Sequence, residues 1–233
     1  MMKHTLSACG KSYHLDIGGG GCDKRSGREP IILEKGGVTI YCYGQDSTSI
    51  FKDKTQLILT LADGHGPLQS GKSISYRIHE LIIKCILDIN EFLVTNLKLG
   101  NYDIIKSKIN SIFNDVNNSI LYTDTLTSKY MTGGTTLNIV HKIIDVDTGE
   151  LYTISSNVGD SSYLKIENNQ VSEISQEQNC DNIVAVEEYY NHCLENDIEP
   201  SKIILGRFNT PGGFLLHWVG YNPIEPYKYS IEN

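Results

Sequence analysis

The spacing of apolar residues predicts two long helices in the middle of the chain. From about Ser70 onward, apolar side chains recur at three- and four-residue steps, and residues 102–122 repeat this spacing. Such steps place the apolar side chains on one face of a helix, where they can pack against a core. Gly100-Asn101 separates the two segments and suits a helix end followed by a turn. A shorter helix is expected over residues 184–194.

Short apolar runs bounded by turn residues predict β-strands on both sides of these helices. Asp147-Thr148-Gly149-Glu150 and Asn168-Asn169 are expected to form the turns of two hairpins. The combination of helices and hairpins indicates an α+β fold. The strands expected from the pattern are 38–43, 56–62, 135–146, 151–156, 162–167 and 170–174.

The two ends of the chain show weaker patterns. Residues 1–37 are rich in Gly and polar residues, and the run Gly18 to Gly21 favours a flexible loop because glycine restricts the backbone least. Residues 206–233 contain several Pro and Gly residues and predict short strand-like pieces only.

The composition is that of a globular protein that is not expected to bind polyanions. The chain has 233 residues, 39% hydrophobic and 21% charged, with a formal net charge of -8. Nucleic acids and anionic membranes attract basic surfaces, so neither is an expected partner. No apolar run reaches the roughly 18 residues that span a bilayer, and no apolar leader occupies residues 1–12, so a cytoplasmic location is expected. Six widely spaced cysteines without a C-x-x-C pair favour free thiols over zinc ligands or disulfides.

Candidate chemistry begins at Asp63-Gly64-His65-Gly66, directly after the strand expected over 56–62. A carboxylate fixed at a strand end and an open main-chain carbonyl beside it suit a hard cation such as Mg²⁺ or Mn²⁺. His65 could donate a proton near neutral pH. Asp46 follows the strand expected over 38–43, and whether it lies near Asp63 depends on how these strands pair. Asp160 closes a later strand in a Gly-Asp turn.

Four segments, taken together, resemble motifs of the PP2C (PPM) family of metal-dependent protein phosphatases. They occur in the family's order, with two helices between the second and the third, and the resemblance covers residues 38–175. In chain order they are Gly44 to Ser47, similar to the (E/Q)-D motif; Leu57 to Gly66, similar to the signature strand and DGHG turn; Gly133 to Thr136, similar to the (S/G)GTT strand start; and Leu151 to Leu164, similar to the LYVANVGDSRAVL hairpin.

The resemblance implies a fold and an activity. The fold would be one domain over residues 1–233, a PP2C-like β-sandwich flanked by helices in α-β-β-α layers, with its C-terminal strands missing or remodelled. The activity would be hydrolysis of phosphoserine or phosphothreonine in protein substrates by a metal-bridged water, with Mg²⁺ or Mn²⁺ as cofactor in a two-metal site of which one metal or both are retained.

The resemblance also implies roles for five positions. Asp63 matches the aspartate that bridges the two catalytic metals, and Gly64 matches the glycine whose carbonyl binds one of them. Asp46 matches an acidic residue that supports the same metal. His65 matches the proposed general acid, and Asp160 matches an aspartate linked to an accessory metal.

Departures from the family pattern leave a non-catalytic alternative open. The family has two further aspartates near its C-terminus, in D-G-x-x-[DE] and D-N segments, and neither occurs in a suitable place after residue 175. Asp181-Asn182 spells D-N but comes too early. A phosphate-binding Arg is also missing before Asp46. The alternatives are therefore a catalytically inactive relative that binds a phosphoprotein or another partner, and a fragment of a longer enzyme.

Gly66 to Ser73 offers a competing interpretation, because GPLQSGKS fits the P-loop pattern G-x-x-x-x-G-K-[ST] between an expected strand and an expected helix. Two features weigh against it. Asp63-Gly64-His65 separates the apolar strand from the loop, and the downstream chain predicts hairpins rather than repeated βαβ units. A P-loop nucleoside triphosphatase is therefore a minor alternative.

Overall fold

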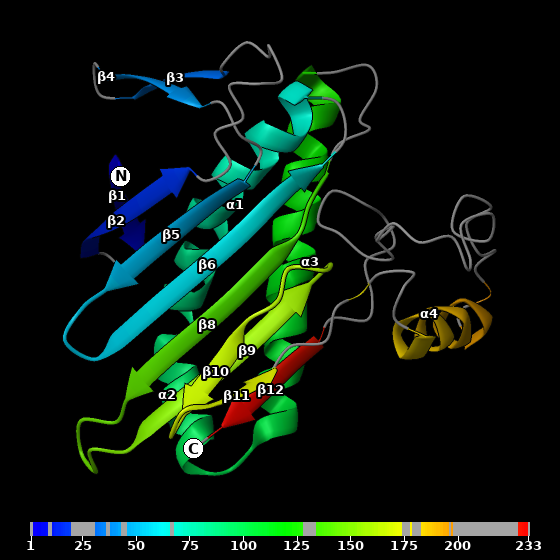
Figure 1. Cartoon of the computed structure of the whole chain (residues 1–233). Helices are drawn as coiled ribbons and strands as arrows, with labels where there is room; N and C mark the ends of the chain where they lie inside the picture. Colours follow the sequence, from blue (N-terminus) through cyan, green and yellow to red (C-terminus); the bar gives the residue numbers. More distant parts are fainter. Residues whose placement is uncertain are drawn as a thin grey trace.

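The computed structural model describes residues 2–8, 11–19, 31–35, 38–42, 46–65, 68–127, 134–173, 178, 183–195, 197 and 228–232. Within these ranges, a large twisted sheet carries long helices along one face (Figure 1). The α+β class expected from the sequence is therefore confirmed.

The large sheet has eight strands in the order β1-β2-β5-β6-β8-β9-β12, with β7 also paired to β6. All of these pairings are antiparallel. Two further antiparallel pairs, β3–β4 and β10–β11, form small sheets of their own. The strand bounds are β1 Met2–Ala8, β2 Lys11–Gly19, β3 Ile31–Lys35, β4 Val38–Cys42, β5 Asp46–Lys52, β6 Gln56–His65, β7 Gly134–Thr135, β8 Leu137–Ile144, β9 Leu151–Val158, β10 Leu164–Glu167, β11 Gln170–Glu173 and β12 Lys228–Glu232.

The helices confirm the predicted periodicity and correct one boundary. α1 (Leu68–Asp88) and α2 (Asn90–Lys98) replace the single helix expected from Ser70 onward, and α3 (Tyr102–Thr127) and α4 (Ile183–Glu195) lie where helices were predicted. α2 ends as expected, because Gly100 has a φ of 67° and its N–H donates to the Leu97 carbonyl at 3.0 Å. This is the usual glycine-terminated helix end.

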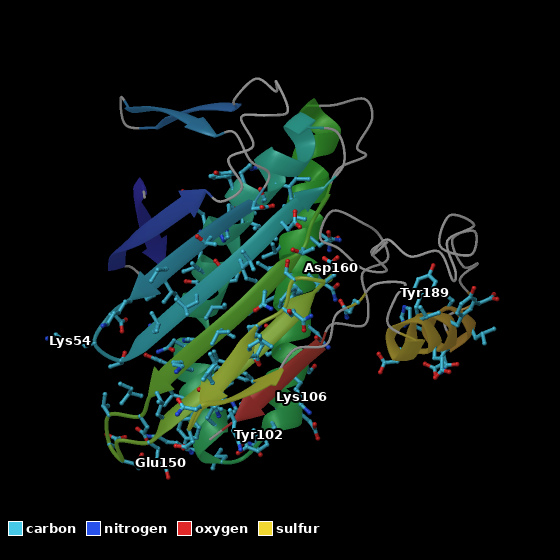
Figure 2. The ribbon with its side chains drawn as sticks, viewed as in Figure 1. Lys54, Tyr102, Lys106, Glu150, Asp160 and Tyr189 are labelled. Carbon is cyan, nitrogen blue, oxygen red and sulfur yellow. The ribbon has the colours of Figure 1, made fainter. Side chains whose placement is uncertain are left out.

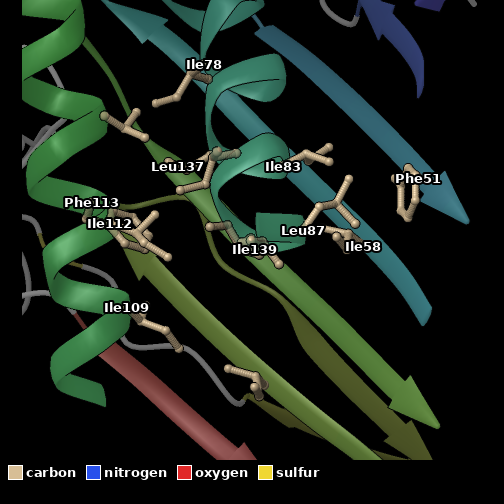
Figure 3. Packing of buried hydrophobic residues seen from close by; sticks show 14 of the residues in the cluster. Phe51, Ile58, Ile78, Ile83, Leu87, Ile109, Ile112, Phe113, Leu137 and Ile139 are labelled. Carbon is tan, nitrogen blue, oxygen red and sulfur yellow. The ribbon is translucent and has the colours of Figure 1, made fainter. Parts of the chain in front are cut away.

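The hydrophobic core fills the space between the sheet and these helices (Figure 3). Phe113 on α3 is 2% exposed, and Ile58 on β6 is fully buried. Every second residue of β8 and β9, such as Ile139 and Ile154, is buried on the side that faces the helices. Buried side chains from α1, α3 and the sheet include Ile78, Ile83, Leu87, Ile109, Ile112, Leu137 and Ile139.

A buried polar cluster joins α1 to the sheet. The Nε2 atom of His79 lies 2.7 Å from the Ser47 hydroxyl, and its Nδ1 atom lies 2.6 Å from the Thr60 hydroxyl. Ser47 Oγ also donates to the Ser75 carbonyl at 2.7 Å, and Ser49 bonds to Thr60. These bonds satisfy groups that would otherwise be costly to bury. His79 therefore has a structural role in the core.

The structure settles how the strands around Asp46 and Asp63 pair, which the sequence left open. The strand expected over 38–43 is β4, and it pairs with β3 rather than with β6. On one side β6 pairs with β5, a strand that the sequence did not predict and that begins at Asp46. Two glycines of the expected flexible loop, Gly18 and Gly19, instead lie in β2 opposite β5; Gly20 and Gly21 lie outside the described residues.

The two predicted hairpin turns are confirmed. Asn168 and Asn169 connect β10 to β11 with φ values of 51° and 63°, as expected of a two-residue hairpin turn. Between β8 and β9, the carboxylate of Asp145 accepts bonds from the Asp147 N–H at 3.0 Å and the Thr148 hydroxyl at 2.8 Å. Lys98 at the end of α2 also pairs with Asp145 at 2.8 Å, so this turn is tied to the helical layer.

After β9, the segment that leads to β10 contacts the face of the sheet opposite the helices. Val140 and Ser155 are paired and share that face, because their neighbours Ile139 and Ile154 point into the core. Tyr163 lies immediately before β10, and its hydroxyl bonds to Ser155 on that face. The large sheet also keeps a C-terminal strand, because β12 pairs with β9 at its edge; the rest of 206–233 lies outside the described residues.

Two predictions about composition can be compared with the structure. Cys85, half-buried in α1, and Cys193, buried in α4, are free thiols as expected; the side chains of the other four cysteines lie outside the described residues. No helix in the described part of the chain is long and apolar enough to cross a membrane.

Candidate metal and active site

Two aspartates meet at one end of the large sheet. β5 and β6 are antiparallel, and their register places Asp46 directly opposite Asp63. Residues in this relation lie on the same face, with Cβ atoms about 5 Å apart. The face is the one turned away from the helices, because the next residues, Ser47 and Ala62, are buried beneath them. The two carboxylates therefore converge, which the sequence left open.

The main-chain carbonyl of Gly64 is directed toward the same region. The Asp63 carbonyl accepts the N–H of Thr136 at 2.9 Å, on the side of β6 where β7 and β8 lie. Successive carbonyls along a strand point in opposite directions in the plane of the sheet. The Gly64 carbonyl therefore points toward β5, next to Asp46 at the start of that strand.

Asp160 reaches this end of the sheet from the turn after β9. Gly159, with a φ of 95°, lets the chain turn sharply. The Gln178 side-chain oxygen accepts the Gly159 N–H at 2.8 Å, and the Gln178 N–H donates to the Gly159 carbonyl at 3.0 Å. Figure 2 shows Asp160 far from Lys54 and Glu150, which mark the turns at the opposite end. The turn is thus fixed at the end of the sheet that carries Asp63, and the charge of Asp160 acts on the Asp63 carboxyl.

The electrostatics of Asp63 reflect this crowding. Partial desolvation, a hydrogen bond between the protonated Asp63 carboxyl and Asp46, and the negative charges of Asp46 and Asp160 together raise the pKa of Asp63 from 3.8 to about 7. The Asp63 side chain is nevertheless exposed, so water and ions can reach it. Facing carboxylates with a raised pKa are stabilised when a cation lies between them.

These donors fit a divalent cation of the hard type. Carboxylate and carbonyl oxygens are the ligands that Mg²⁺ and Mn²⁺ prefer, and Mg²⁺ is often held by only one or two carboxylates with waters completing the shell. Among the residues whose positions are described, no group of three or more His, Cys, Asp or Glu side chains is arranged to hold a metal ion. Asp46, Asp63 and the Gly64 carbonyl therefore form the fitting set, and Asp160 adds negative charge beside it.

The pKa of Asp63 predicts how the stability of the metal-free protein depends on pH. Because the folded-state pKa of about 7 lies above 3.8, its contribution to stability is present at low pH and is lost as pH rises through 7. In EDTA, the melting temperature of Asp63→Asn relative to that of the wild type should therefore rise as the pH is raised from about 5 to about 8. Thermal unfolding of both proteins across this range checks it, and a constant difference would contradict the assignment.

Two other predictions at this site have different outcomes. His65 is the last residue of β6, and its backbone pairs with Gly134 in β7. The His65 side chain lies outside the described residues. The P-loop interpretation of Gly66 to Ser73 is wrong: α1 already begins at Leu68, so Lys72 lies inside the helix. The sheet around β6 is also antiparallel, unlike the parallel sheet of P-loop proteins.

Sequence reasoning missed the residues that hold Asp63 and the turn of Asp160 in place. The Thr136 hydroxyl accepts the Asp63 N–H at 3.0 Å and lies 2.6 Å from the Ser161 hydroxyl. The Asn138 side chain donates to the Ser161 carbonyl at 3.2 Å. The only signal in the sequence was the position of Thr136 in the GGTT segment, because the bonds to Ser161 and Asn138 join residues that are distant along the chain.

Comparisons with known proteins identify the fold. No family model and no curated protein match the sequence. Solved structures do match. A bacterial serine phosphatase is 18% identical with a TM-score of 0.52, and the match covers 94% of this chain and 73% of that one. Serine/threonine phosphatase Stp1 from Staphylococcus aureus is 16% identical with a TM-score of 0.51, and the match covers 100% of this chain and 75% of that one. A mutant of the bacterial serine phosphatase matches with a TM-score of 0.49, and the chain spans only 64% of its length. The chain has the fold of PP2C-type phosphatases, as the resemblance implied.

Proposed function

We propose that this chain is a metal-dependent protein phosphatase that hydrolyses phosphoserine or phosphothreonine in protein substrates with Mg²⁺ or Mn²⁺. The observation that carries the proposal is the register of β5 and β6, which brings Asp46 opposite Asp63 at an accessible end of the sheet. Structural neighbours that are serine and serine/threonine phosphatases support the same reaction class.

In this proposal each residue has a defined task. Asp46 and Asp63 hold the cation with their carboxylates, and the Gly64 carbonyl binds it from the main chain. When bound there, the cation supplies Lewis acidity for phosphoryl transfer and lowers the pKa of water. Asp160 strengthens the negative field that attracts a cation, as the family's accessory-metal aspartate would. His65 is proposed to donate a proton to the leaving oxygen.

A second candidate function is a non-catalytic protein that binds phosphoproteins on the same fold. The favouring observation is the small number of ligands, because in the described part of the chain Asp46 and Asp63 are not joined by a third suitably placed side chain. The sequence after residue 175 also lacks the two further aspartates of the family pattern. With fewer carboxylates, less of the cation's dehydration is offset, so binding of a second metal would weaken.

Hydrolysis of a phosphothreonine peptide separates the two functions. We expect release of inorganic phosphate with Mn²⁺ and none in excess EDTA, because the proposed reaction needs the cation to offset charge on the phosphoryl group. Phosphate release measured in both conditions, with the unphosphorylated peptide as blank, checks this. Absence of turnover together with saturable binding of the phosphopeptide would instead support the non-catalytic protein.

A further inference from the structure

The end of β6 that carries Asp63 and the turn that carries Asp160 are joined by one buried hydroxyl. Thr136 is fully buried, and its Oγ1 atom accepts the Asp63 N–H at 3.0 Å. The same atom lies 2.6 Å from the Ser161 hydroxyl, one residue after Asp160. A hydroxyl can accept and donate at once, so Thr136 can bond to both segments simultaneously.

The backbone of Thr136 adds a second bond to the Asp63 segment, because its N–H donates to the Asp63 carbonyl at 2.9 Å. Asp63 is therefore held on both its N–H and its carbonyl by one residue. On the other side, the side chain of Asn138 in β8 also holds Ser161, because it donates to the Ser161 carbonyl at 3.2 Å. The separation of the Asp63 segment from the turn of Asp160 thus depends on side chains just before and at the start of β8.

We propose that Thr136 is a positioning residue that fixes the Asp63 segment relative to the turn carrying Asp160 and thereby prepares the site for a divalent cation. The inference rests on the proposed function for the identity of the ligand. Its structural part, the coupling of the two turns through the Thr136 hydroxyl, rests on the hydrogen bonds alone. A rigid donor set raises metal affinity because less ordering is left to the binding step.

The neighbouring residue offers a matched control. Thr135 is also fully buried, but its hydroxyl donates to the Thr136 carbonyl at 2.9 Å, a contact between adjacent residues. Thr136→Val and Thr135→Val remove the same atom from the same kind of environment. Of the two, the Thr136 change alone breaks the link between Asp63 and Ser161.

The experiment combines hydrogen exchange with Mn²⁺ titration calorimetry on the full chain. In Thr136→Val we expect faster exchange at the Asp63 amide and in residues 159–161, and Mn²⁺ affinity lowered about tenfold, within the range for loss of a residue that supports metal ligands. Thr136→Ser, which keeps the hydroxyl, should stay within about threefold of the wild type. Thr135→Val should leave exchange in both turns and the affinity unchanged.

Each alternative outcome has a defined meaning. Equal exchange and equal Mn²⁺ affinity in Thr136→Val and Thr135→Val would overturn the inference. A wild type that binds no Mn²⁺ would instead overturn the proposed function, and exchange would then decide the coupling by itself. If Thr136→Val does not fold, Ser161→Ala removes the same bond from a half-buried position. Ser161→Ala should then speed exchange in residues 159–161 but not at Asp63. Unchanged exchange in residues 159–161 would also overturn the inference.

Discussion

Replacing Asp63 with asparagine should abolish Mn²⁺-dependent hydrolysis of a phosphothreonine peptide, with a loss of at least about 100-fold. Asparagine has nearly the same shape but carries no charge, so the carboxylate facing Asp46 no longer balances a divalent cation. The same change should weaken Mn²⁺ binding measured by calorimetry. Because hydrolysis and binding share one site, the two losses should appear together.

The matched control for this variant is Asp103→Asn on α3. It changes the net charge by the same amount, and the Asp103 side chain is fully exposed. Activity and Mn²⁺ affinity of Asp103→Asn should stay near those of the wild type, because screening weakens the effect of a distant exposed charge. Full activity in Asp63→Asn, or equal losses in the two variants, would refute the role assigned to Asp63.

The second large effect concerns the layer of helices behind the sheet. Phe113 lies in the core between α3 and the strands (Figure 3), and Phe113→Ala should lower the free energy of unfolding by about 3–5 kcal/mol through lost burial and a cavity. For a chain of this size, that corresponds to a melting temperature lower by roughly 10 °C. Denaturant and thermal unfolding measure both quantities.

Ile104 on the same helix provides the control, because 51% of its surface is exposed. Ile104→Ala should change the free energy of unfolding by no more than about 0.5 kcal/mol, as is usual for surface positions. Similar destabilisation by the two substitutions would mean that α3 does not pack on the sheet through the face that carries Phe113.

The helices and most hairpins could be predicted because their signals are local. In α1 the three- and four-residue steps of apolar residues match the buried positions, for example Ile74, Ile78 and Ile82. Asn168-Asn169 and Gly100 marked a turn and a helix end through their own conformational preferences. The break at Ile89 was missed because the apolar spacing continues into α2, where Leu93 and Leu97 are buried.

Strand β5 was missed because its buried side is polar. Ser47 and Ser49 point into the helical layer, where His79 and Thr60 satisfy their hydroxyls. A hydrophobic pattern cannot reveal such a strand, since the partners that make its burial tolerable come from other elements. Phe51 is the apolar residue on that side.

The candidate site was predictable in its residues but not in its arrangement. Asp63 and Gly64 follow an apolar strand, so their place at a strand end could be inferred from local sequence. The convergence of Asp46 and Asp63 depends on strand register, and a shift of one residue would place Asp46 on the other face. The bonds through Thr136 are long-range in sequence and appear only once the chain is folded.

The central claim is that Asp46 and Asp63 together hold a divalent cation. Crystals of the wild-type protein grown with MnCl₂ should show a peak in the anomalous difference map between the two carboxylates, within about 2.0–2.6 Å of an oxygen from each. An ordered sheet with Asp46 opposite Asp63 and no such peak between them would contradict the claim.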